Sequence, residues 1–268
     1  MLLLAGSNER SAKQDYWLGG STAIVAGLVN VCSVIAFFAF ASNVTGHVAV
    51  LTEELVKGHW HQLRVVGVWL LAFLSGAFVA HMIVTGVAKR AARIARGVAL
   101  TMEIAILSAV GYYGAIHYSE TLTETEYLVG LLLFGMGLQN SLVATVSGGV
   151  VKTTHLTGLM TDLGMELSGF VQGKTRTDRS LAFKLKLHLI ILGTYMGGGI
   201  LGGLLFMEVG FMAFFAGSGL LTLILAYDLL GERVASYGRR GAAAFDGSWE
   251  LGASGASASS SSDPDRAS

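Results

Sequence analysis

Four long segments of the chain contain no Asp, Glu, Lys or Arg: residues 17–46, 65–88, 128–151 and 187–207. At about 1.5 Å per residue in a helix, each is long enough to cross a hydrocarbon core of about 30 Å. Only 13% of all residues are charged, against about 25% in a typical soluble domain. The sequence therefore predicts an all-α polytopic membrane protein embedded in a lipid bilayer.

Composition also excludes several classes of function. The formal net charge is zero, and without a basic stripe the chain lacks the electrostatic footprint of nucleic-acid binding. Cys32 is the only cysteine, and the seven histidines show none of the spacings typical of metal ligands. No nucleophile–base or dinucleotide pattern is found either. We expect no enzyme activity, no metal and no cofactor.

The hydrophobic pattern predicts six membrane-spanning helices, at about 18–41, 65–88, 98–117, 127–151, 186–207 and 210–229. Lys and Arg are concentrated in the links between spans two and three and between spans four and five, and after span six. The positive-inside rule makes these links and both termini cytoplasmic. Residues 1–16 form an N-terminal cytoplasmic segment, and residues 233–268, rich in Gly, Ala and Ser, are predicted to be a disordered cytoplasmic tail.

An internal repeat divides the rest of the chain into residues 17–120 and 121–232. Gly27-Leu28-Val29-Asn30 matches Gly137-Leu138-Gln139-Asn140, and Thr45-Gly46 with Glu54 matches Thr157-Gly158 with Glu166 at the same spacing. Three spans in each half is an odd number, so the second half must be inserted upside down relative to the first. This predicts the inverted-topology repeat found in many secondary transporters.

Each Thr-Gly motif follows the first span of its half, without room for another full crossing. We predict short helices at Val44–Val56 and Leu156–Val171 that re-enter the membrane or lie at its surface. Asn43 and Thr45, and then Thr154 and Thr157, are natural N-caps for them.

The residues of the second motif resemble a known family. Gly137-Leu138-Gln139-Asn140, then Lys152-Thr153-Thr154-His155-Leu156-Thr157-Gly158 and Leu163, resemble the signature of the YoaK family (DUF1275, also called UPF0700). The resemblance runs over about residues 17–230 and implies a bacterial inner-membrane protein, but no substrate. The first half departs from the family pattern, because relatives usually carry Asp at the position of Asn30 and Asn at that of His47.

Two readings stay open for the polar residues of the spans. Asn30 and Asn140 can be interhelical glue or contacts to a solute or ion. The Thr-Gly motifs can be helix caps and packing contacts, or helix starts that direct free N–H groups at a solute. Glu54, Asp162 and Glu166 can lie at the water interface or act as gating and proton-coupling groups. Glu103, inside span three, can bind a proton, but we expect it to snorkel to the cytoplasmic surface.

The favoured hypothesis is a small secondary transporter that moves a small polar or anionic solute by alternating access at the interface of the repeats, with proton coupling as a further hypothesis. Its alternative is a non-transporting membrane scaffold or an accessory subunit of a complex, and a homodimer is a hypothesis under either. The candidate pathway residues are Asn30, Thr45, Gly46, His47, Glu54, Gln139, Asn140, Thr154, His155, Thr157, Gly158, Asp162 and Glu166.

Overall fold

The structure, a computed structural model, describes residues 10–86, 92–174 and 178–230, and these residues form helices and connecting segments only. The long helices are α1 (Ala12–Phe37), α3 (Trp60–Thr85), α4 (Ala92–Ile116), α5 (Leu122–Val146), α7 (Arg179–Val209) and a last helix at 214–230. Two shorter helices, α2 (Val44–Lys57) and α6 (Leu156–Val171), lie between them, and the 3-10 helix η3 (Gly210–Ala213) follows α7. The predicted tail at 233–268 lies outside the described residues.

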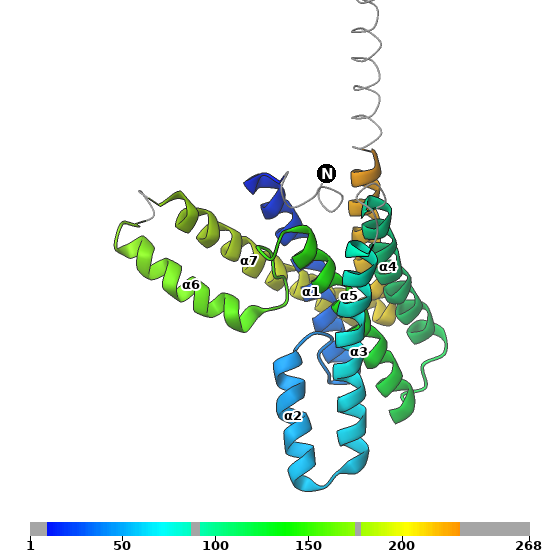
Figure 1. Cartoon of the computed structure of the whole chain (residues 1–268). Coiled ribbons are helices and arrows are strands. Elements are labelled where there is room, and N and C mark those ends of the chain that lie inside the picture. The colour runs from blue at the N-terminus through cyan, green and yellow to red at the C-terminus, as the bar shows by residue number, and fades with distance from the viewer. Residues whose placement is uncertain (1–9, 87–91, 175–177, 231–268) are drawn as a thin grey trace, which may run out of the picture.

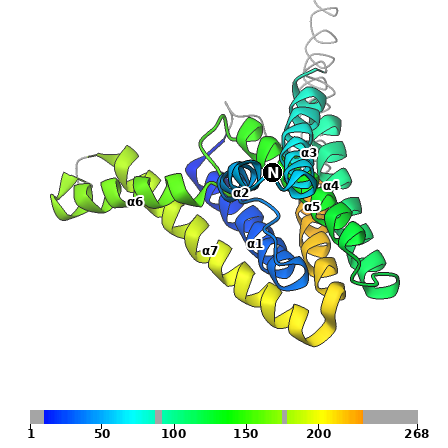
Figure 2. The same ribbon diagram turned by 90° about the horizontal axis from the view of Figure 1, so that it is seen from below.

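Five segments of the described chain are long and apolar enough to cross a membrane. The last of them, Arg179–Leu230, is 52 residues long, about twice what one crossing needs. Its helix is interrupted at Gly210, where φ is 59°, and at η3 the chain turns back on itself (Figure 2). These helices are those of a multi-pass membrane protein.

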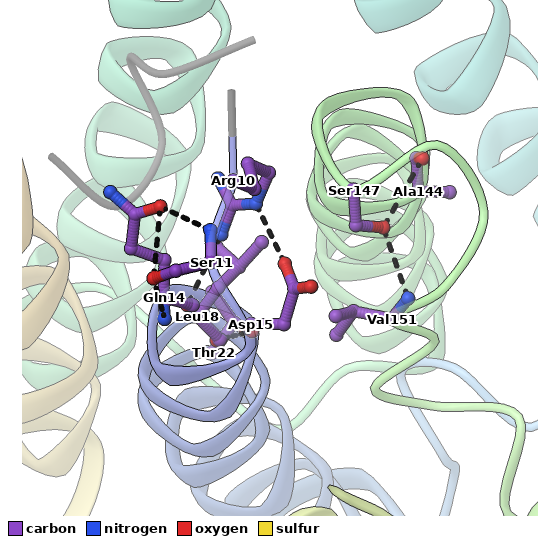
Figure 3. Close-up of polar contacts among 9 residues, drawn as sticks. All are labelled: Arg10, Ser11, Gln14, Asp15, Leu18, Thr22, Ala144, Ser147 and Val151. Carbon is purple, nitrogen blue, oxygen red and sulfur yellow. Dashed lines mark hydrogen bonds and ion pairs between the residues drawn. The ribbon is translucent and has the colours of Figure 1, made fainter. Parts of the chain in front are cut away.

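The first helix begins earlier than the sequence predicted. Ser11 caps α1 by accepting a hydrogen bond from the backbone N–H of Gln14, whose side chain bonds back to the N–H of Ser11. Arg10 forms an ion pair of 2.7 Å with Asp15 (Figure 3). This capping box allows a helix to start among polar residues, which a hydropathy pattern does not detect.

Two predicted spans, 18–41 and 127–151, extend too far at their C-terminal ends. The helix α1 stops at Phe37, because Phe38 takes a left-handed conformation with φ of 55°, and the Ser33 hydroxyl donates to the carbonyl of Ala39. The helix α5 stops at Val146, and the Ser147 hydroxyl then accepts a bond from the N–H of Val151 (Figure 3). Apolar residues continue through the break after α1, so composition did not show it. The break after α5 contains Gly148 and Gly149, both with positive φ, and this helix-breaking pair was not used in the prediction.

The two short helices lie where the sequence predicted them, but their caps differ. Asn43 caps α2 by accepting a hydrogen bond from the backbone N–H of Gly46. The equivalent N-cap of α6 is His155, whose side chain makes no capping bond. The prediction that Thr154 or Thr157 caps α6 is wrong: the Thr154 hydroxyl is used elsewhere, and Thr157 already lies inside the helix.

Among the labelled helices, those before residue 121 pack mainly against those after it. The most extensive contacts between labelled helices join α1 to α7 and α5 to α3, and Figures 1 and 2 show both pairs side by side. The short helices lie at the periphery, α2 on α3 and α6 on α7. The hairpins α2–α3 and α6–α7 therefore extend from the core in different directions (Figure 1).

Glycines allow these two crossings to be close. A Cβ at Gly27 of α1 would overlap the carbonyl oxygen of Tyr195 in α7, and a Cβ at Gly137 of α5 would overlap that of Phe73 in α3. Small residues permit such close approach of helix backbones in membrane proteins. Gly27 and Gly137 are equivalent in the repeat, so Phe73 and Tyr195 occupy equivalent places as well.

Candidate functional site

A cavity of about 630 Å³, which we call the central cavity, lies where the two Thr-Gly motifs meet. The breaks after α1 and α5 border it, and so do the first turns of α2 and α6 and one face each of α3 and α7. Its lining comprises Asn30, Phe40, Ser42, Asn43, Val44, Thr45, Phe73, Asn140, Ala144, Lys152, Thr154, His155, Leu156, Thr157 and Tyr195. Six of the residues selected from the sequence are therefore brought together: Asn30, Thr45, Asn140, Thr154, His155 and Thr157.

The residues that line the central cavity come in pairs, one member from each half of the repeat. Apart from Ala144, the lining consists of seven pairs of residues at equivalent places in the repeat: Asn30 with Asn140, Phe40 with Lys152, Ser42 with Thr154, Asn43 with His155, Val44 with Leu156, Thr45 with Thr157, and Phe73 with Tyr195. Both halves thus contribute the same segments to one space.

The two asparagines differ in how fully their amides are used. The Asn30 amide nitrogen donates to the carbonyl of Ala26 and to the Ser42 hydroxyl, and its oxygen accepts from the N–H of Ser42. The Asn140 oxygen accepts one bond of 2.7 Å from the Thr154 hydroxyl, and within the described residues its NH₂ group has no partner. Asn30 is structural glue in this conformation, whereas Asn140 retains two donors at the cavity.

The electrostatic potential of the central cavity is most positive on the side formed by residues of the second half, near Lys152 and the start of α6. Among the described residues that line the cavity, Lys152 is the only Asp, Glu, Lys or Arg. The N-terminus of α6 begins beside it and lacks the side-chain cap that Asn43 gives α2. Uncapped N–H groups and the helix dipole both favour negative charge, so this side suits an anion or the acceptor atoms of a polar solute.

A second cavity, the side cavity, has a volume of about 690 Å³ and lies between α6 and the first part of α7. Lys152 and His155 line both cavities, so the two spaces adjoin. Three further residues selected from the sequence line the side cavity: Gly158, Asp162 and Glu166. Lys184 and His188 also line the side cavity.

The equivalent carboxylates Glu54 and Glu166 each pair with a histidine, but in different surroundings. Glu166 is 5% exposed, and its carboxylate lies 3.0 Å from Nδ1 of His188 in α7. Glu54 lies 2.7 Å from His59, at the end of α2 remote from the central cavity. Only the second-half carboxylate lines a cavity that adjoins the central one.

The remaining candidates lie outside both linings. Gly46 packs over the Asn43 side chain, and Gln139 is buried where its amide donates to the carbonyl of Thr22 in α1. His47 is buried with its ring edge-on to Trp69. In this conformation none of the three is positioned to contact a solute.

His47 gives a pH prediction. Burial lowers the pKa of its imidazole, although the bond from Nε2 to the carbonyl of Phe40 opposes this. A lowered pKa means that the neutral form holds the 38–47 segment in place, so this stability is present above the ordinary histidine pKa and is lost as pH falls below it. We expect faster amide hydrogen exchange in residues 38–50 at about pH 5.5 than at about pH 7.5, after correction for intrinsic rates.

The matched variant is His47→Gln, which lacks a group that titrates in this range. Its corrected exchange rates should not depend on pH across the same interval. If wild type and His47→Gln respond alike, protonation of His47 does not control this segment.

Sequence reasoning missed the aromatic pair Phe73 and Tyr195, the hydroxyl of Ser42 and the partner His188. Phe73 and Tyr195 lie in α3 and α7, where the repeat has few polar residues to align. Each is followed three residues later by a glycine, Gly76 or Gly198, that lies against the backbone of the facing helix. This shared spacing is the signal that would have allowed the sequence repeat to be aligned through α3 and α7. Nothing in the spacing of Glu166 and His188 indicated that they would meet.

In residues 10–86, 92–174 and 178–230 no group of three or more His, Cys, Asp or Glu is placed to hold a metal ion. Residues 18–227 match the model of DUF1275, described as a protein of unknown function. The chain belongs to this family. The match spans both halves of this DUF1275 protein and every residue of the central cavity. Searches of curated proteins and of solved structures found no match.

Proposed function

We propose that this DUF1275 protein is a small secondary transporter, which moves a small polar or anionic solute by alternating access between two inverted halves. The observation that carries the proposal is the paired lining of the central cavity, with seven equivalent residues from each half. Transporters built from inverted repeats bind substrate at the repeat interface, at the ends of broken helices. The breaks after α1 and α5 give the central cavity that setting.

The proposed topology has six crossings. The segment Arg179–Leu230 supplies two of them, α7 and the last helix, separated by η3. With three crossings in each half, the halves have opposite orientation. The exchange of partners, α1 on α7 and α5 on α3, is the arrangement expected of a pseudo-two-fold axis. We place both termini in the cytoplasm of a bacterium, with the chain in its inner membrane.

The solute class follows from the lining. Irregular backbone at membrane depth is tolerated where it borders a water-filled cavity, and the N-termini of α2 and α6 both reach this one. Lys152 and the uncapped start of α6 favour negative charge, and the Asn140 amide supplies two donors. The rings of Phe73 and Tyr195 border the same space and suit an apolar portion of the solute.

The conformation is proposed to be open to the cytoplasm. The side cavity adjoins the central cavity and extends to Lys184 near the start of α7, beside the Lys/Arg-rich sequence that the positive-inside rule assigns to the cytoplasm. Glu166, with Asp162 one turn before it, is the proposed gating or coupling carboxylate. Replacement of Glu166 by Gln should stop pH-driven uptake while the protein still folds.

Cysteine accessibility tests the proposal. In a Cys32→Ala background, single cysteines replace Thr45 and Thr157, the equivalent lining residues of the two halves. We expect impermeant thiol reagents to label both, faster from the cytoplasmic side, because both line the central cavity. Sulfate, phosphate, nitrate and acetate, with urea and glycerol as neutral probes, are then screened for protection of the two cysteines.

The matched control is Thr52→Cys, on the exposed surface of α2 outside both cavities. It should gain no protection from any solute of the panel. If neither Thr45→Cys nor Thr157→Cys labels from either side of the membrane, the motifs are dry packing contacts and the scaffold alternative is the better description.

A further inference from the structure

The sequence predicted that Glu103 snorkels to the cytoplasmic surface, and this prediction is wrong. Glu103 is 0% exposed and interrupts the buried stripe of α4 that contains Ala99, Leu100, Leu107 and Val110. Neither carboxyl oxygen has a hydrogen-bond partner within the described residues. It lines neither the central nor the side cavity, so the proposed pathway leaves this group unexplained.

The position of Glu103 follows from the contacts of the residues around it. Ile106 of α4 packs on Gly135 of α5, and Leu107 packs on Gly217 of the last helix. Because α4 and α5 run antiparallel (Figure 1), one turn back along α4 from Ile106 corresponds to one turn forward along α5 from Gly135. That turn of α5 carries Gln139, whose Oε1 is also buried and without a partner.

Charged and titratable groups lie near the ends of the elements packed against this region. They are His61, Arg64 and His81 on α3; Glu124, Glu126 and Tyr127 on α5; Tyr227 and Asp228 on the last helix; Lys13, Asp15, Tyr16 and Cys32 on α1; and Arg96, Tyr112 and Tyr113 on α4 itself. None of the described ion pairs or hydrogen bonds joins Glu103 to any of these groups. An ionised carboxylate here would therefore be a buried charge without compensation, which costs several kcal/mol in a protein interior.

We propose that Glu103 is a proton-binding site within the membrane, occupied by a proton in this conformation, with Gln139 Oε1 as the acceptor available to the acid. The amide of Gln139 already bonds to the carbonyl of Thr22, so the site lies where α1 and α5, the first helices of the two halves, meet. Release of the proton requires water or a cation to reach Glu103, and thus a movement of α4 relative to α5 or the last helix. The bound proton is separate from any solute in the central cavity.

This inference does not depend on transport, so its test differs from that of the proposed function. Infrared spectra of the full-length protein in liposomes are compared for wild type and Glu103→Gln. Near neutral pH we expect a carboxylic-acid C=O band in wild type that is absent from Glu103→Gln. The matched control is Glu208→Gln, an exposed carboxylate at the end of α7, which should lose carboxylate intensity and keep the acid band.

Labelling by a hydrophobic carbodiimide provides a second readout. The neutral acid adds across the N=C bond: a carboxyl oxygen bonds to carbon, the proton passes to nitrogen, and the adduct rearranges to a stable N-acylurea with no leaving group. We expect mass spectrometry to find this adduct on Glu103, with a yield that falls as pH rises, and to find none in Glu103→Gln. A water-soluble carbodiimide with an added amine should modify Glu208 and spare Glu103.

The infrared spectra and the labelling each have an outcome that would contradict a protonated Glu103. An acid band that persists unchanged in Glu103→Gln, or a loss of carboxylate intensity in that variant, would overturn the proposal. Modification of Glu103 by the water-soluble reagent, at a rate independent of pH, would also overturn it. Substitution by Gln keeps the volume and neutrality of the proposed acid, so the variant should fold.

Discussion

Alanine at Gly27 and alanine at Gly137 should each destabilise the protein by about 1–3 kcal/mol or more, the usual range for overpacking. The new Cβ would overlap a backbone carbonyl oxygen of the facing helix, that of Tyr195 or Phe73, and a backbone cannot move aside as a flexible side chain can. The measurement is equilibrium unfolding in detergent, together with the fraction of folded protein recovered by gel filtration. Equal effects at the two glycines would also support their equivalence in the repeat.

The matched control is Gly197→Ala, one residue before the contact glycine Gly198 in α7. A Cβ at Gly197 would meet nothing within 4 Å, and alanine is about 1 kcal/mol better than glycine in a helix interior. Gly197→Ala should therefore be as stable as wild type or more so. If Gly27→Ala unfolds at the same denaturant concentration as wild type, the α1–α7 crossing is looser than described.

The second large effect should separate the two asparagines of the central cavity. Asn30→Ala should lower the free energy of unfolding by at least about 2 kcal/mol, because it leaves the buried N–H of Ser42 without its acceptor. Asn140→Ala loses one hydrogen bond, with Thr154, and should cost about 1 kcal/mol or less. It should instead weaken solute binding about tenfold, the equivalent of about 1.4 kcal/mol.

Both variants are measured by thermal unfolding and by solute protection of Thr157→Cys, with the solute that protects the otherwise unaltered protein. Equal losses of stability at Asn30 and Asn140, without a change in protection by the solute, would mean that both asparagines have only a structural role. Loss of protection in Asn140→Ala at wild-type stability would assign the Asn140 amide to the solute.

Several features could be predicted because the polar residues are few and mark the repeat. The matching Asn, Thr-Gly and Glu predicted both short helices, whose starts at Val44 and Leu156 agree with the structure. They also selected six residues that now line one cavity. In an apolar span a polar side chain needs a partner or water, so its position in the sequence carries information about the fold.

Other features could not be predicted, because they depend on how the helices are rotated and paired. Whether Glu103 reaches the surface or the core depends on which face α4 turns toward α5, and hydropathy does not specify that. The helix break after Phe37 lies within continuous apolar sequence, whereas the break after Val146 was signalled by Gly148 and Gly149, which the prediction did not use. The contact between Glu166 and His188 depends on α6 folding back along α7, and no local pattern shows this.

The exchange of partners between the halves has a consequence for biosynthesis. The helix α1 is synthesised first, yet the backbone on which Gly27 packs belongs to α7, which emerges after five other helices. Until then its glycine surface, with Asn30 nearby, must be covered by lipid, by the insertion machinery or by an incorrect neighbour. A chain that ends after α4 lacks both α5 and α7 and leaves the surfaces of α3 and α1 that they cover without a partner, so we expect membrane proteases to degrade it.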